Sequence, residues 1–128
     1  MLRCGIDLVE VGRVGDAIRR HGDRFLRRVF TPDEIRYCQT KVDPWPHYAA
    51  RFAAKEAFFK SLVPGTLEAL IWREVGVGHH ASGAPSLEFS GTTRERLQGW
   101  RFQLSLSHVR EMALAQVLAL PPGERAPR

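Results

Sequence analysis

Residues 112–120 (Met-Ala-Leu-Ala-Gln-Val-Leu-Ala-Leu) constrain the fold more than any other segment of this chain. Their length and the turn residues at 109–111 predict a strand, and this strand is apolar on both faces. Its expected hairpin partner, residues 101–107, alternates apolar and polar side chains instead. A strand that is apolar on both faces has to be covered on both sides. We expect a helix on one side and another layer, such as a second subunit, on the other.

The rest of the chain mixes helical and strand periods, which predicts an α+β fold. The first strand has a period of two, with Asp7 on the face opposite Ile6. Thr31-Pro32-Asp33-Glu34 combines a capping Thr, an early Pro and a Glu three residues after the cap, which together are typical of a helix start. Helices are expected at 11–20, 32–40, 47–62 and 92–98, and strands at 2–9, 70–77, 86–90, 101–107 and 112–120.

The chain has 128 residues, enough for one domain, which we place at residues 1–120, with a frayed tail at 121–128. No stretch reaches the roughly 20 apolar residues of a membrane span, and no hydrophobic signal core opens the chain. Its two cysteines, Cys4 and Cys38, form neither a disulfide framework nor a zinc site. We therefore expect a cytoplasmic protein that does not act at a membrane.

The net charge of +5 comes almost entirely from arginine, since only three of the 19 basic residues are Lys. Arginine pairs with phosphates and carboxylates, so anionic partners are expected. Six arginines fall between Arg13 and Arg28. This run fits a solvated helix face, a docking surface for an acidic protein, or nucleic-acid binding, although it lacks aromatic stacking residues for the last.

Glu56 is the most informative single residue. On a helical wheel it falls within the apolar stripe that includes Ala49, Phe52 and Phe59. A carboxylate in such a place is costly unless it is paired or binds a metal. The structural alternative is an ordinary ion pair with Lys60, one helical turn later.

Asp7 and His108 are weaker candidates on their own. Asp7 lies in the first predicted strand, and with Glu56 it would supply the two carboxylates that a Mg²⁺ site typically uses beside phosphate oxygens. Its alternative role is to accept a hydrogen bond from a nearby amide. His108 ends a predicted strand directly after Ser105-Leu106-Ser107, whereas His79-His80 has no ligand spacing and is given no role.

Four motifs together resemble the holo-acyl carrier protein synthases, the short 4′-phosphopantetheinyl transferases. They are Gly5-Ile6-Asp7-Leu8-Val9-Glu10, Arg51-Phe52-Ala53-Ala54-Lys55-Glu56-Ala57 with Lys60, Gly83-Ala84-Pro85, and Leu104-Ser105-Leu106-Ser107-His108. They occur in the family's order and spacing from residue 1 to about 120.

The resemblance implies an antiparallel sheet packed against a long central helix. It also implies an enzyme of fatty-acid or polyketide synthesis that transfers 4′-phosphopantetheine from coenzyme A to a serine of an acyl carrier protein. Adenosine 3′,5′-bisphosphate is then the leaving product. The catalytic residues implied are Asp7, Glu56, Lys60 and His108, with Mg²⁺ held by Asp7 and Glu56; the coenzyme A-binding residues implied are Arg51, Lys60, Gly65, Pro85 and His108.

The family also implies a homotrimer whose sites lie at subunit boundaries, and an acidic carrier protein that docks on Arg13, Arg20 and Arg24. Nucleic acid then becomes the lesser alternative as a partner. The proton acceptor stays open between Glu56, a metal-bound water, and Asp7 acting through water. One departure concerns Val63-Pro64-Gly65, where the family has Gly-Thr-Gly near the phosphates, because Pro64 lacks an amide donor.

Overall fold

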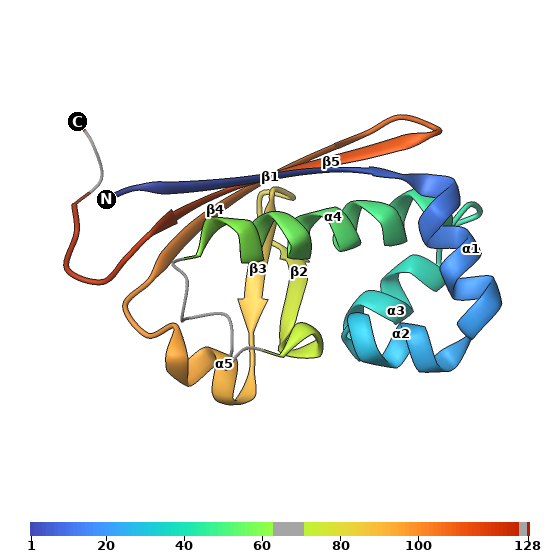
Figure 1. Cartoon of the computed structure of the whole chain (residues 1–128), viewed down its shortest axis with the longest axis horizontal. Coiled ribbons are helices and arrows are strands. Elements are labelled where there is room, and N and C mark those ends of the chain that lie inside the picture. Colours follow the sequence, from blue (N-terminus) through green and yellow to red (C-terminus); the bar gives the residue numbers. More distant parts are fainter. Residues whose placement is uncertain (63–70, 126–127) are drawn as a thin grey trace.

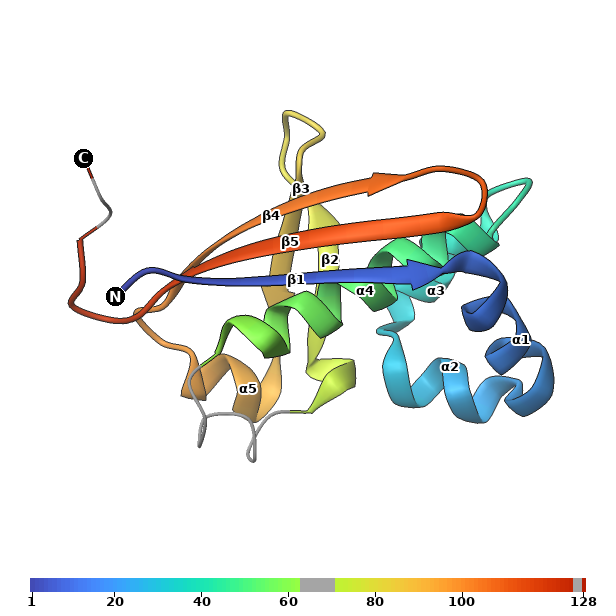
Figure 2. The same ribbon diagram turned by 45° about the horizontal axis from the view of Figure 1, so that its top comes forward.

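A three-stranded antiparallel sheet forms one layer of the molecule, with one long helix packed along it (Figure 1). The computed structural model describes residues 1–62, 71–125 and 128. The strand order is β1 (Arg3–Glu10), β5 (Met112–Leu120), β4 (Arg101–His108), as seen in Figure 2. The long helix is α4 (Trp45–Ser61). The α+β prediction is therefore confirmed, and the division of the chain at residue 120 stays a prediction.

Small side chains on β5 let α4 approach the sheet closely. Every second residue of β5 faces the helix and is fully buried, namely Ala113, Ala115, Val117 and Ala119. The predicted coverage of this strand by a helix is confirmed. Its other face remains open in the single chain, where Leu114 is 38% exposed and its neighbours on β1, Ile6 and Leu8, are 55% and 61% exposed.

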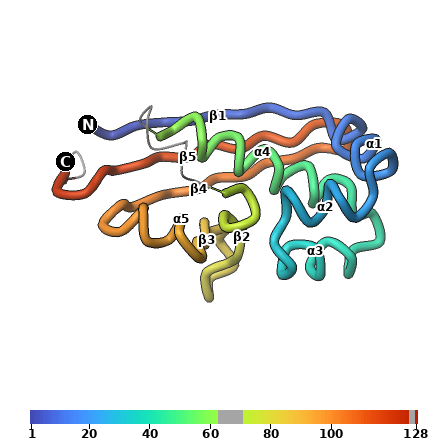
Figure 3. The backbone as a smooth tube through the Cα atoms, turned by 60° about the horizontal axis from the view of Figure 1, so that its bottom comes forward, coloured from blue at the N-terminus to red at the C-terminus, as the bar shows by residue number. Residues whose placement is uncertain are grey.

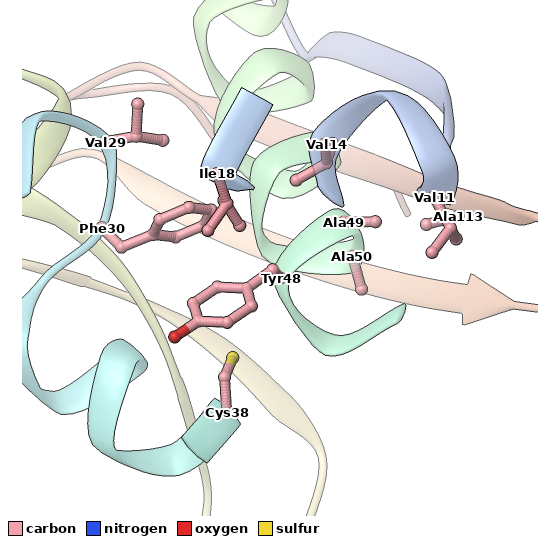
Figure 4. Packing of buried hydrophobic residues seen from close by; sticks show 10 residues of the cluster. All are labelled: Val11, Val14, Ile18, Val29, Phe30, Cys38, Tyr48, Ala49, Ala50 and Ala113. Carbon is pink, nitrogen blue, oxygen red and sulfur yellow. The ribbon is translucent and has the colours of Figure 1, made fainter. Parts of the chain in front are cut away.

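Three short helices pack against the first half of α4, at one end of the sheet (Figure 3). They are α1 (Val11–His21), α2 (Asp23–Val29) and α3 (Pro32–Gln39). Figure 4 shows the apolar cluster that joins them to α4 and the sheet, with Phe30 and Tyr48 at its centre. Helix α2 was not predicted as an element of its own.

The predicted start of α3 is confirmed in detail. Thr31 Oγ1 accepts a hydrogen bond from the Glu34 amide, and the Glu34 carboxylate accepts one from the Thr31 amide. Helix α4 begins at Trp45, two residues earlier than expected. Pro46 is tolerated there because the first turn of a helix needs no amide donor from it.

The remaining described residues form a hairpin and a short helix below α4 (Figure 1). The hairpin consists of β2 (Val75–His79) and β3 (Pro85–Phe89), and the helix is α5 (Gly91–Arg96). The strand expected at 70–77 is wrong over Trp72–Glu74, which form a 3-10 turn (η2). Residue 70 of this expected strand lies outside the described residues. The Glu74 carboxylate, which accepts hydrogen bonds from the Thr93 amide and the Thr92 hydroxyl, ties this turn to α5.

A buried ion pair joins α4 to α3 and the hairpin. Lys55 is fully buried, and its Nζ donates to the Glu34 carboxylate and, at 2.6 Å, to the Val29 carbonyl. Glu34 also accepts from the Val77 amide at 3.1 Å. One carboxylate therefore closes the helix cap, pairs with Lys55 and satisfies a strand amide, which fixes α4 relative to its neighbours. Within residues 1–62 and 71–125, no helix is both long and apolar enough to cross a membrane.

Candidate active site

Asp7 and Lys60 meet where α4 crosses β1. Lys60 Nζ donates to Asp7 Oδ1 at 2.8 Å and to the Ile6 carbonyl at 3.2 Å. The Asp7 side chain is 15% exposed and that of Lys60 52% exposed, so the pair lies at the rim of the sheet rather than in the core. The hydrogen bond to Asp7 raises the pKa of Lys60 and keeps it charged.

Glu56 lies on the same side of α4, one turn before Lys60. It is half-buried. Burial is the main cause that raises the pKa of Glu56, the charge of Asp7 adds to it, and Lys60 acts in the opposite direction. Two carboxylates and one ammonium group thus share a small, partly buried space.

Two expectations for this group are corrected. Glu56 was expected in the middle of the apolar stripe, but the buried face of α4 centres on Ala53, Ala54 and Ala57, and Glu56 lies at its border. The fully buried charge is that of Lys55, which Glu34 neutralises. Lys60 pairs with Asp7 and not, as the structural alternative held, with Glu56.

A second polar group lies at the opposite edge of the sheet. His108 ends β4, and its ring centroid is 5.6 Å from that of His47 on α4. Arg51 is buried one turn after His47, and its Nη1 donates to the His47 carbonyl at 3.3 Å. The Arg51 guanidinium stacks on Tyr37 of α3, with Cζ 4.2 Å from the ring centroid.

Helix α4 separates the two groups. Arg51 and Lys60 are about 180° apart around a helix of 3.6 residues per turn. The strands that carry Asp7 and His108 are the two outer strands of the sheet, and at ordinary strand spacing they lie roughly 10 Å apart. The predicted site residues therefore form two clusters, Asp7–Glu56–Lys60 and Arg51–His108, in a single copy of the chain.

Pro85 is linked to the second cluster through His79, whereas Gly65 cannot be placed. Pro85 opens β3 opposite His79, whose ring is 5.3 Å from that of Tyr37. The predicted phosphate contact at Gly65, and the Val63-Pro64 departure beside it, lie outside the described residues.

The three predicted docking arginines are all exposed, Arg13 and Arg20 on α1 and Arg24 on α2. Arg13 also lines a hollow of about 530 Å³ between α1, α4 and the sheet, together with Val9 and Phe52. This hollow begins one residue after Asp7 on β1, at Leu8. Of the three docking arginines, Arg13 is the one that lines this hollow.

Sequence reasoning missed His47 and Tyr37. The spacing of His47 and Arg51, four residues apart on one helix, could have placed both on one face. No sequence pattern brings Tyr37 or His108 to them, because those contacts join separate elements. Among the residues that the structure describes, no group of three or more metal-binding side chains occurs.

Comparison with known proteins assigns the family. The sequence model of the 4′-phosphopantetheinyl transferase superfamily, ACPS, matches residues 3–117. The chain belongs to this superfamily. It is 44% identical to the holo-[acyl-carrier-protein] synthase of Koribacter versatilis (strain Ellin345) over 121 residues, which cover 92% of this chain and 97% of the relative.

Solved structures of the superfamily share the fold. The holo-[acyl-carrier-protein] synthase (AcpS) of Neisseria meningitidis superposes with a TM-score of 0.80 at 32% identity, covering 92% of this chain and 97% of the other. The ACPS–CoA complex of Chronobacterium ammoniagenes gives the same TM-score at 30% identity, covering 93% and 96%. The predicted antiparallel sheet on a long central helix is therefore confirmed as the fold of this superfamily.

Proposed function

We propose that this chain transfers 4′-phosphopantetheine from coenzyme A to a serine of an apo acyl carrier protein and releases adenosine 3′,5′-bisphosphate. The observation that carries this proposal is the Asp7–Glu56–Lys60 cluster, in which two carboxylates and an ammonium group converge between β1 and α4. The printed names of the relatives support it, since they are holo-[acyl-carrier-protein] synthases and one neighbour is a complex with CoA. We place the reaction in the cytoplasm, in fatty-acid or polyketide synthesis.

Asp7 and Glu56 fit a Mg²⁺ ion. Mg²⁺ prefers carboxylate oxygens and usually keeps one or two protein carboxylates together with waters and substrate phosphates. The mutual repulsion of the two carboxylates, which contributes to the raised pKa of Glu56, is the kind of arrangement that a cation relieves. When bound, the ion would neutralise charge on the diphosphate of coenzyme A.

The chain's own residues then position the reactants and manage one proton. The serine oxygen attacks the β-phosphorus of coenzyme A, and the bond to the adenosine bisphosphate oxygen breaks. Lys60, held in place by Asp7, offsets negative charge on the diphosphate in the transition state. The serine loses its proton as its oxygen attacks, and we assign this proton to the Glu56 carboxylate, which lies one turn before Lys60 on α4.

We propose that the complete site needs two copies of the chain, as in the homotrimer that the family resemblance implies. The Asp7–Glu56–Lys60 and Arg51–His108 clusters lie on opposite sides of α4, so one coenzyme A molecule reaches both more readily across a subunit boundary. The open apolar face with Ile6, Leu8 and Leu114 supports such an assembly.

A thermal-shift experiment tests the proposal without needing a carrier protein. A ligand that binds only the native state raises its melting temperature. We expect coenzyme A to raise it in the presence of Mg²⁺, and to do so less after chelation by EDTA. If coenzyme A has no effect with Mg²⁺ present while RNA gives a large, salt-sensitive shift, the chain is a basic binding module instead.

A further inference from the structure

His47 lies in a cluster of aromatic and basic side chains, and the proposed reaction as described so far gives His47 itself no role. Its ring is 5.6 Å from that of His108 and 5.9 Å from that of Tyr37, centroid to centroid. The contacts come from α4, β4 and α3, so three separate elements position one half-buried imidazole.

Within residues 1–62 and 71–125, no carboxylate forms an ion pair with Arg51, which lies one turn after His47 on α4. It is only 4% exposed, and its Nε has no hydrogen-bond partner among the residues that the structure describes. Its Nη1 donates to a neutral carbonyl, that of His47, and its guanidinium stacks on Tyr37. A buried cation is costly without a charged partner, so this position favours a bound anion.

The charges around His47 also favour a bound anion. Burial lowers the pKa of His47, and neighbouring Arg51, Lys41 and His108 lower it further, while Asp43 raises it. Lys41 lies over the Tyr37 ring, with Nζ 4.6 Å from the centroid. The groups that face His47 are thus mostly positive, and the free imidazole is neutral at neutral pH.

We propose that His47 is a further coenzyme A-binding residue of this chain, which together with His108 and Arg51 holds a phosphate monoester. This rests on the proposed function. Coenzyme A carries a diphosphate, which must reach the Asp7–Glu56–Lys60 cluster to react, and a ribose phosphate, which is a monoester. Because α4 separates the Asp7–Glu56–Lys60 cluster from His47, the diphosphate does not reach His47. The ribose phosphate is the remaining phosphate of coenzyme A that His47 can bind.

Binding of a phosphate monoester beside His47 should depend on pH. At pH 7 a phosphate monoester carries a charge of about −1.5 to −2. Such a charge beside the ring favours the imidazolium, so coenzyme A binding takes up a proton at His47. The pKa of His47 is then higher in the complex than in the free protein. The affinity for coenzyme A therefore falls as pH rises from the pKa of His47 in the free protein through its pKa in the complex. Above the pKa in the complex the affinity levels off.

Calorimetric titration of His47→Gln tests this, with His21→Gln on α1 as the matched control. Gln keeps a donor but never carries a charge. Because a charge-assisted hydrogen bond is worth about 1.5–3 kcal/mol, we expect His47→Gln to bind coenzyme A about tenfold more weakly near pH 6. Near pH 8.5 it should bind within about twofold of the wild type, since both side chains are then neutral. His21→Gln should match the wild type throughout.

3′-Dephospho-coenzyme A separates the monoester from the rest of the ligand. The His47→Gln loss should vanish with this compound. A second measurement needs no variant: titration in buffers of different ionisation enthalpy should show the wild type taking up protons with coenzyme A, and fewer with the dephospho compound. Equal affinities of His47→Gln and wild type near pH 6, or an equal loss with both ligands, would overturn the role of His47. Failure of the wild type to bind coenzyme A at all would overturn the proposed function instead.

Discussion

Glu56 combines two properties that a purely structural residue rarely has. It is half-buried, which raises its pKa, and the charge of neighbouring Asp7 raises that pKa further. A raised carboxyl pKa means that folding favours the neutral form, so any stability that Glu56 contributes is present at low pH and lost as pH rises through the folded-state pKa. The ionised form therefore costs stability at neutral pH, which is typical of a residue kept for function.

Glu56→Gln should separate function from stability. We expect carrier-protein loading to fall at least about 100-fold, because a charged group at the reacting phosphate is lost. In the absence of Mg²⁺ and coenzyme A, the melting temperature should rise at pH 7 and stay unchanged near pH 4, where Glu56 is largely protonated. Glu95→Gln on exposed α5 is the control. A lower melting temperature at pH 7 would mean that Glu56 is a stabilising residue.

The sequence predicted which side chains of this cluster lie together but not all of their contacts. Asp7, Glu56 and Lys60 were predicted to work together and do lie together. The wheel could not show that Lys60 reaches across to β1, because a helical wheel contains only neighbours on the same helix. Nor could it show that Lys55 is the buried charge, since its partner Glu34 lies 21 residues away in the sequence.

Among the elements, the contact between β1 and α4 decides the geometry of the site. A Cβ added at Gly5 would lie 1.9 Å from the Ala57 carbonyl oxygen and 2.8 Å from the Ser61 amide nitrogen. Both atoms belong to the backbone of α4, which cannot move as a side chain could. Gly5 therefore lets α4 approach β1 closely enough for Lys60 to reach Asp7.

Gly5→Ala should weaken both the fold and the reaction. We expect a loss of unfolding free energy of about 1–3 kcal/mol or more, as for other overpacked sites, together with a large drop in loading rate. Chemical denaturation and a loading assay measure the two effects. Gly12→Ala in α1 is the control, since its Cβ would meet no atom within 4 Å. It should be neutral or stabilise by about 0.5–1 kcal/mol. Wild-type stability of Gly5→Ala would contradict the close approach.

Elements with strong local patterns could be predicted, and those that depend on distant contacts could not. The Thr31–Glu34 capping box and the strand 112–120 were found because their information is local. The turn at Trp72–Glu74 was read as strand because the hydrogen bonds from α5 that hold Glu74 are invisible in the sequence.

For the whole molecule, we expect the proposed site to be shared between copies of the chain, with one cluster from each copy. The test is to mix two inactive variants, Asp7→Asn and His108→Ala. Random mixed trimers should recover roughly a quarter of the wild-type rate, because each site draws one cluster from each of two neighbouring copies. Mixing Asp7→Asn with Glu56→Gln, which damage the same cluster, should recover nothing. Equal results for both mixtures would contradict a shared site.

The basic side chains with proposed roles form two groups, one buried and one exposed. Arg51 lies in the buried cluster, while Arg13 and Arg20 are exposed on α1. Reversing both exposed charges, Arg13→Glu with Arg20→Glu, should raise the KM for the carrier protein about tenfold or more and leave coenzyme A affinity unchanged. Loading kinetics and calorimetry measure these quantities. An equal loss of both would show that α1 is not a separate docking surface.

Mass spectrometry of an apo carrier protein tests the central claim most directly. The carrier protein is incubated with this chain, coenzyme A and Mg²⁺. The account predicts a mass gain of one phosphopantetheine group on its serine, and none with Glu56→Gln. No gain with the wild type across a panel of acidic carrier proteins would contradict the claim that this chain is a phosphopantetheinyl transferase.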